Sequence, residues 1–246
     1  MAIDPLPISA ATALPIRNGA RLLSPALTQL LFAAIAFVGT HFALSHPLRA
    51  PIVRRVGEPA FLGIYSLVAF ATLGWMVVAF RAAPAADLPG SGDMGWAVAS
   101  VLTVPALVLF LGSLSKNPAL PNPRTQAAIN RAPTGVFAVT RHPMMWGFAL
   151  WGVAHIVLWF DIRTLIVAGA ITFLALVGAH MQDRKKRRLL GNGWASWQSR
   201  TSFWPRWHKL FSAGWLLWAG ALVLWLVLTF AHMPGAGVPA GIWRWL

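Results

Sequence analysis

The sequence predicts an all-α protein, an integral membrane bundle of about six transmembrane helices. Hydrophobic residues make up 57% of the 246-residue chain and charged residues only 11%, whereas about a quarter of an ordinary soluble domain is charged. Apolar runs of about 20 residues, the length that crosses a hydrocarbon core of about 30 Å, alternate with segments that hold most of the charge and proline. The period-two alternation of a membrane β-barrel is absent from these runs, so helices are the structures that can satisfy the backbone in lipid.

Each apolar run is predicted to form one helix of a single transmembrane domain that covers residues 1–246. The predicted spans are 25–46, 58–80, 94–114, 143–160, 162–181 and 210–231. Pro143 suits the first turn of the fourth span, because its missing amide donor costs nothing there. The fourth and fifth spans are joined only around Asp161, so we expect a tight antiparallel hairpin. Small residues on the fifth span, Gly169, Ala170 and Gly178, would allow close packing.

The basic residues are distributed unevenly between the loops. Most of the 20 lysines and arginines fall in the loops after the first, third and fifth spans, including the run RKKRR at 184–188. This bias predicts that those loops are cytoplasmic. The net charge of +14 then reflects orientation and contact with membrane lipid, and no nucleic-acid partner is expected. In the last of these loops Trp194, Trp197, Trp204 and Trp207 are predicted to lie at headgroup level as an aromatic belt.

Two histidines lie well inside predicted spans, where an ionisable side chain marks a candidate functional site. His155 shares one face of the fourth span with Gly147, Trp151 and Trp159, which recur every four residues, and His41 lies in the first span. The residues alone leave two explanations open: a hydrogen bond to a neighbouring helix, or two helices that each donate one imidazole to a haem. A zinc site is not expected, because the chain has no cysteine and only six acidic residues.

Four stretches of the chain carry a family resemblance. They are THFALSHPLRAPIVRRVGEPAFLGIYSL at 40–67, TRHPMMWGFALWGVAH at 140–155, DRKKRRLLGNGWASWQSRTSFWP at 183–205 and FAHMPGAG at 230–237. In these stretches the chain resembles the NnrU family of bacterial membrane proteins and is similar to the related zeta-carotene isomerases, which are haem b membrane enzymes with two axial histidines. The resemblance implies a protein of the bacterial inner membrane with a link to denitrification and nitric oxide.

The resemblance also implies residue roles. His41 and His155 correspond to the two axial ligands of the haem iron. Arg141 is expected near the haem propionates, since a helix N-terminus attracts anions. The implied activity is that of a haem-dependent isomerase or redox enzyme acting on a hydrophobic polyene, or of a haem protein that binds nitric oxide. Gly152 stands where the isomerases have a cysteine, which counts against the isomerase reaction more than against haem.

An alternative comes from the Arg-His-Pro element at 141–143, which is also similar to the isoprenylcysteine carboxyl methyltransferases. In those enzymes the element helps to hold S-adenosylmethionine, so a membrane methyltransferase that uses S-adenosylmethionine is the second hypothesis. The match is incomplete, because the tyrosine of that motif is Met145 here and the later acidic pair reads Gln182 and Asp183.

If His41 and His155 bind the same haem iron, the two side chains must lie at the same depth in the membrane. At about 1.5 Å per helical residue, His41 lies about 12 Å from Arg49, and His155 lies about 21 Å from Arg141. Helix tilt, or a deep position of Arg141, must bring the two imidazoles to one level if they share an iron.

Overall fold

The computed structural model describes residues 24–85, 90–120 and 125–246. Six apolar helices form the bundle: α1 Pro25–Ser45, α2 Arg49–Ala82, α3 Gly92–Ser113, α6 Pro143–Leu158, α7 Ile162–Leu190 and α9 Trp215–Ala236. Five of them are long and apolar enough to cross a membrane, whereas α6 has only 16 residues. Within the described ranges there is no strand. The prediction of an all-α membrane bundle is therefore confirmed.

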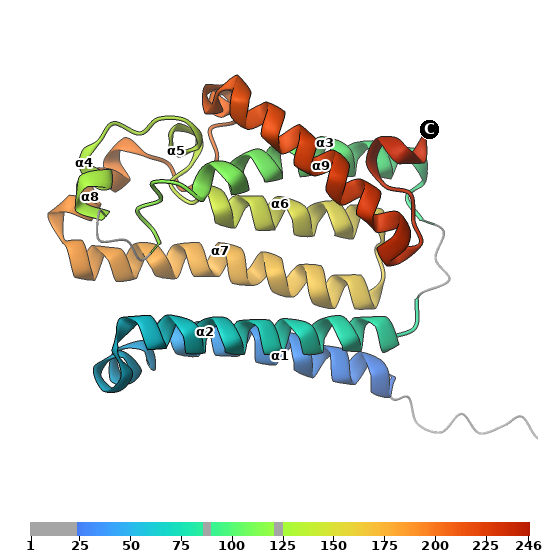
Figure 1. Ribbon diagram of the computed structural model, residues 1–246, viewed down its shortest axis with the longest axis horizontal. Coiled ribbons are helices and arrows are strands. Elements are labelled where there is room, and N and C mark those ends of the chain that lie inside the picture. The colour runs from blue at the N-terminus through green and yellow to red at the C-terminus, as the bar shows by residue number, and fades with distance from the viewer. Residues whose placement is uncertain (1–23, 86–89, 121–124) are drawn as a thin grey trace, which may run out of the picture.

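The helices are stacked in the order that Figure 1 shows. α1 pairs with α2, and both contact α7. On its other side α7 contacts α6, which packs against α3, and α9 lies on the outside of α3. Outward-facing apolar side chains are exposed, such as Phe70 at 73% and Trp215 at 75%, as expected of surfaces that meet lipid. α7 therefore separates the α1–α2 pair from α6.

The three basic loops gather at one end of the bundle, which we call the basic end (Figure 1). It holds the short helices α4 Thr125–Asn130, α5 Val136–Val139 and α8 Asn192–Arg200 and the 3-10 helix η1 Trp207–Ala213. Lys185 Nζ donates to the Ser45 carbonyl at 3.0 Å, and Lys186 Nζ to the Leu120 carbonyl at 3.4 Å. The opposite end, the distal end, holds the α6–α7 turn and the 3-10 helix η2 Gly241–Arg244.

Several predicted helix boundaries were wrong. α9 begins at Trp215 instead of residue 210, because Gly214 with a φ of 89° separates it from η1. α2 begins at Arg49 instead of 58 and contains a break at Gly57, whose φ is 81°. α7 continues past residue 181 through the basic run, and α6 ends at Leu158 instead of 160. Gly214, with its positive φ, thus decided the start of α9, which hydropathy alone misplaced. The break at Gly57 falls directly before residue 58, where hydropathy placed the start of the second span.

The α6–α7 hairpin forms as predicted, but its close contact is made by a different glycine. A Cβ on Gly152 of α6 would lie 2.2 Å from Thr172 Oγ1 and 2.9 Å from the Ala168 carbonyl oxygen of α7. A Cβ on Gly169 or Gly178 would meet no neighbouring atom within 4 Å. The prediction for these two glycines was wrong, because they do not face α6.

Two of the four tryptophans expected in an aromatic belt lie in the core instead. Trp194 is fully buried and Trp197 is 2% exposed. They pack against α3 and the segment after it, through Leu109 and Ile129 among others. Trp204 and Trp207 are 67% and 46% exposed, as a belt requires. The difference arises because residues 192–200 form α8, which folds against the basic end, whereas hydropathy indicated only a loop.

Candidate functional site

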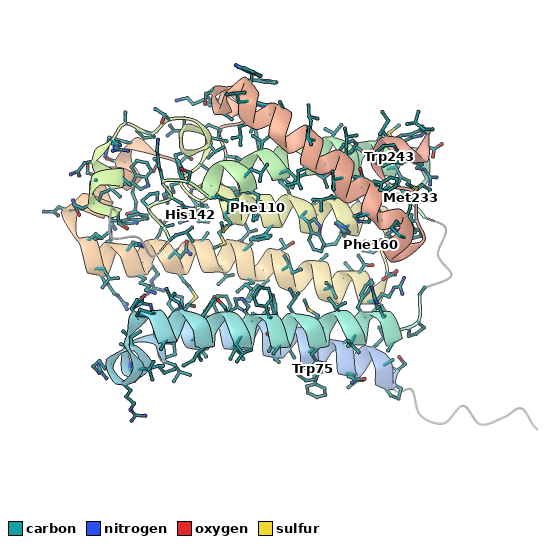
Figure 2. The ribbon with its side chains drawn as sticks, viewed as in Figure 1. Trp75, Phe110, His142, Phe160, Met233 and Trp243 are labelled. Carbon is teal, nitrogen blue, oxygen red and sulfur yellow. The ribbon has the colours of Figure 1, made fainter. Side chains whose placement is uncertain are left out.

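A buried ionic cluster joins the start of α6 to α7 at the basic end. Arg141 Nε donates to both carboxylate oxygens of Asp183, at 3.1 and 2.8 Å, and its Nη2 donates to Oδ2 at 2.6 Å. His142 Nε2 lies 2.9 Å from Asp183 Oδ1. The side chain of His142 is fully buried and that of Asp183 is 8% exposed. Figure 2 shows His142 at the start of α6, at the basic end of the bundle.

Neighbouring residues fix the position of this cluster. Trp194 Nε1 donates to Asp183 Oδ1 at 3.3 Å, so the buried indole of α8 is a further hydrogen-bond donor to this carboxylate. The backbone before α6 is held by residues that follow α8: Arg141 N donates to the Ser202 carbonyl at 2.8 Å, and Trp146 Nε1 donates to the Phe203 carbonyl at 2.8 Å. The Arg-His-Pro element therefore joins α6, α7 and α8 at one point.

His155 lies one turn before the end of α6, with its ring against that of Trp151. The ring centroids are 4.1 Å apart, and His155 Nδ1 lies 2.8 Å from the Trp151 carbonyl oxygen. Because a carbonyl only accepts, Nδ1 must carry the proton. Nε2 then holds the free lone pair. Among the described residues none forms a hydrogen bond with that nitrogen.

His41 has the same local arrangement near the end of α1. Its Nδ1 lies 2.7 Å from the Phe37 carbonyl oxygen, so Nε2 again holds the lone pair. The ring contacts Phe37 and, edge-on, Tyr65 of α2, with centroids 4.3 and 5.5 Å apart. Each of the two predicted ligands thus has the carbonyl acceptor that an imidazole ligand needs for its second nitrogen.

The structure does not bring His41 and His155 together. The two fully described helices α1 and α6 have no contact with each other, and α7 lies between them (Figure 1). The rings also differ in level. His41 is one turn, about 6 Å, from Ser45 at the basic end, whereas His155 is 13 residues, about 20 Å, from His142 at the same end. Arg141, engaged by Asp183, is also remote from His155.

A third histidine, His232 on α9, lies at the distal end of the bundle, as His155 does. The fully described helices α6 and α9 do not contact each other, and α3 packs against both. His232 Nδ1 lies 2.7 Å from the Leu228 carbonyl oxygen, so it too holds its free lone pair on Nε2. Packing places it at the same level: the Val238 amide donates to the His232 carbonyl, and Val238 packs on the cluster that contains Ala154.

The view in Figure 2 agrees, since Met233 and Phe160 both lie at the distal end, opposite His142. His232 was not among the histidines that the sequence singled out. Its place in FAHMPGAG, one of the stretches that carry the family resemblance, was the signal available, but its position near the level of His155 depends on α9 crossing α3 toward the distal end. Through the described parts of the chain, no cluster of three or more His, Cys, Asp or Glu side chains is placed to hold a metal ion; a bis-histidine site needs only two.

The protein-family model described as NnrU protein matches residues 29–240 of the chain. It includes all six apolar helices almost completely, and it includes His41, Arg141, His155 and His232. Comparison with curated proteins and with solved structures gives no match.

Proposed function

This chain belongs to the NnrU family, and from that premise we propose that it is a haem b-binding membrane protein with His155 as an axial ligand. The observation that supports the proposal is the state of the His155 ring. Its Nδ1 proton is held by the Trp151 carbonyl at 2.8 Å, which leaves Nε2 as the lone-pair nitrogen. Neutral imidazole of this tautomer is the form that binds haem iron.

A second histidine that would hold the same haem must lie at the same level of the bundle as His155. His41 is about 14 Å nearer to the basic end than His155, so it does not meet this condition. His232 lies near the level of His155 and has the same tautomer, with the proton on Nδ1. We therefore propose His232 as the second ligand in place of His41.

Bound haem would supply electron transfer, or binding of a small gas such as nitric oxide if one axial histidine dissociates. Both imidazoles are half-buried, but α9 packs only on α3 among the described membrane helices, whereas α6 is held between α3 and α7. His232 is therefore the ligand expected to leave. The basic end is proposed to face the cytoplasm of a bacterial cell, following the positive-inside bias.

The geometry favours a structural role for the Arg-His-Pro element over the binding of S-adenosylmethionine. In the methyltransferase hypothesis Arg141 and His142 would hold a cofactor. Here both side chains bind Asp183, an internal carboxylate, and the cluster is nearly closed to solvent. Neither Arg141 nor His142 is therefore free to bind a ligand carboxylate.

Absorption spectra of the purified protein, reconstituted with haem, test the proposal. Wild type is expected to show a Soret band with the split visible bands of a reduced bis-histidine haem. His155→Ala should lose most of the bound haem, and His232→Ala should bind haem with a five-coordinate spectrum. His41→Ala is the matched control, since it removes an imidazole with the same tautomer from the opposite side of α7.

An unchanged spectrum for His155→Ala would refute the site, and an effect of His41→Ala equal to that of His155→Ala would restore the pairing implied by the family resemblance. Two further measurements separate the activities. A Soret shift when nitric oxide is added to the reduced protein supports gas binding. Conversion of a cis-polyene by the reduced protein supports an isomerase.

A further inference from the structure

A pocket of about 220 Å³ opens at the basic end, remote from His155. Its wall is formed by the end of α3, by α4 and α5, by α8 and by the start of α9. The floor is apolar and includes Phe137, Val136 and Leu217. Gly112 allows this floor to close, since a Cβ there would lie 2.5 Å from Val136 and 2.8 Å from Leu217.

The rim of the pocket is cationic. Lys116 and Arg131 belong to its lining, and among the described residues that line it none is acidic. Both side chains are exposed. The backbone beneath Arg131 is fixed, because Arg200 Nη1 donates to the Arg131 carbonyl at 2.9 Å and Arg200 Nη2 donates to the Ile129 carbonyl. The Arg131 guanidinium thus projects from a rigid turn.

A buried hydrogen-bond donor also belongs to the pocket. Trp197 lines it and is 2% exposed, yet its indole nitrogen has no acceptor in the part of the chain that the structure describes. Leaving a buried hydrogen-bond donor without a partner carries an energetic cost. A ligand oxygen at this position would remove that cost. The pocket therefore combines two cations, a free N–H and an apolar floor.

From this combination we infer that the pocket binds an anionic phospholipid. Arginine and lysine are the side chains that recognise phosphate, and the apolar floor is suited to the start of an acyl chain. The pocket adjoins the ends of α3 and α9, which are both membrane-spanning helices, so it opens at the level where headgroups lie. The phosphate group occupies the rim between Lys116 and Arg131, and an ester oxygen accepts from Trp197.

Native mass spectrometry of the full-length protein in detergent tests the inference, with phosphatidylglycerol as the probe and phosphatidylcholine as the zwitterionic comparison. Wild type is expected to retain one phosphatidylglycerol in preference to phosphatidylcholine. The double variant Lys116→Gln/Arg131→Gln should bind it about thirtyfold more weakly, since each of the two basic residues near a membrane surface contributes about 1 kcal/mol. Trp197→Phe keeps the ring but lacks the N–H, and should weaken binding about threefold.

Arg54→Gln/Arg55→Gln is the matched control. It removes the same charge from exposed positions on α2, outside the pocket, and should leave phosphatidylglycerol retention unchanged. Equal losses in the two double variants would overturn the inference, since binding would then follow net charge. If inorganic phosphate binds the wild type as tightly as phosphatidylglycerol does, the site recognises free phosphate and the lipid assignment is overturned.

Discussion

His142 Nε2 lies 2.9 Å from Asp183 Oδ1, and this contact joins the first residue before α6 to the last part of α7. Arg141 approaches the same carboxylate from the adjacent position, and Trp194 reaches it from α8. Three separate segments therefore depend on one acidic side chain. Removing that side chain's charge should affect the fold far more than removing an exposed carboxylate.

Asp183→Asn is expected to destabilise the protein by about 3 kcal/mol, because it leaves Arg141 buried without its partner. The measurement is thermal unfolding in detergent, followed by tryptophan fluorescence. Asp93→Asn is the matched control: Asp93 pairs with Arg244, but its side chain is 71% exposed, and loss of an exposed pair costs at most about 1 kcal/mol. Equal melting temperatures for the two variants would contradict the structural role of the cluster.

Gly152→Ala is expected to destabilise the α6–α7 hairpin by about 1–3 kcal/mol. The added Cβ would lie 2.9 Å from the Ala168 carbonyl oxygen, and overpacking of this kind forces helices apart. Gly169→Ala, on the facing helix but in open space, should instead be neutral or stabilise by up to about 1 kcal/mol through helix propensity. Relative to wild type, the melting temperature should fall in Gly152→Ala and stay equal or rise in Gly169→Ala. An unchanged melting temperature in Gly152→Ala would show that α6 and α7 are not closely packed at this glycine.

Lys116→Gly is expected to stabilise the fold while it weakens lipid retention. Lys116 has a φ of 56°, a left-handed conformation that costs about 1–2 kcal/mol in residues other than glycine. Part of that gain is offset by the greater freedom of glycine in the unfolded chain, so a net rise of about 0.5–1 kcal/mol is expected. Lys116→Gln loses the same charge but still places a non-glycine residue in the left-handed conformation. Its melting temperature should therefore be no higher than that of wild type.

Trp194→Phe is expected to lower stability by about 1 kcal/mol or more, because Trp194 is fully buried and its indole donates to Asp183. Trp204→Phe, at a position that is 67% exposed, should change the unfolding free energy by less than about 0.5 kcal/mol in detergent. Comparable losses in both variants would argue that Trp194 belongs to a surface belt, as hydropathy had indicated.

Hydropathy was sufficient to predict the six helices, the all-α class and the clustering of the basic loops at one end. These depend on local composition, since each helix in lipid must satisfy its own backbone. The protonated Nδ1 of His41 and His155 was also predictable, because the carbonyl one turn earlier is a local acceptor within the same helix.

Tertiary neighbours were not predictable from the same information. The sequence singled out Asp183 only as part of the incomplete match to the acidic pair of the methyltransferases. Its position directly before RKKRR, in a chain with only six acidic residues, was nevertheless a usable signal of an ion pair. The distance between His41 and His155 depends on the position of α7 between their helices, which no period in the sequence specifies. The burial of Trp197 was not predictable either. Although α8 is amphipathic, it follows a strongly charged run, so its sequence indicated an exposed loop.

The short length of α6 has a consequence for the surrounding bilayer. Its 16 residues extend about 24 Å, against a hydrocarbon thickness of about 30 Å. Such a hydrophobic mismatch is relieved where the bilayer thins. The ion pair of Arg141 and Asp183 marks the end of α6 that lies at the basic end, and the leaflet on that side is the one expected to deform. The protein should therefore distribute toward thinner regions of the membrane.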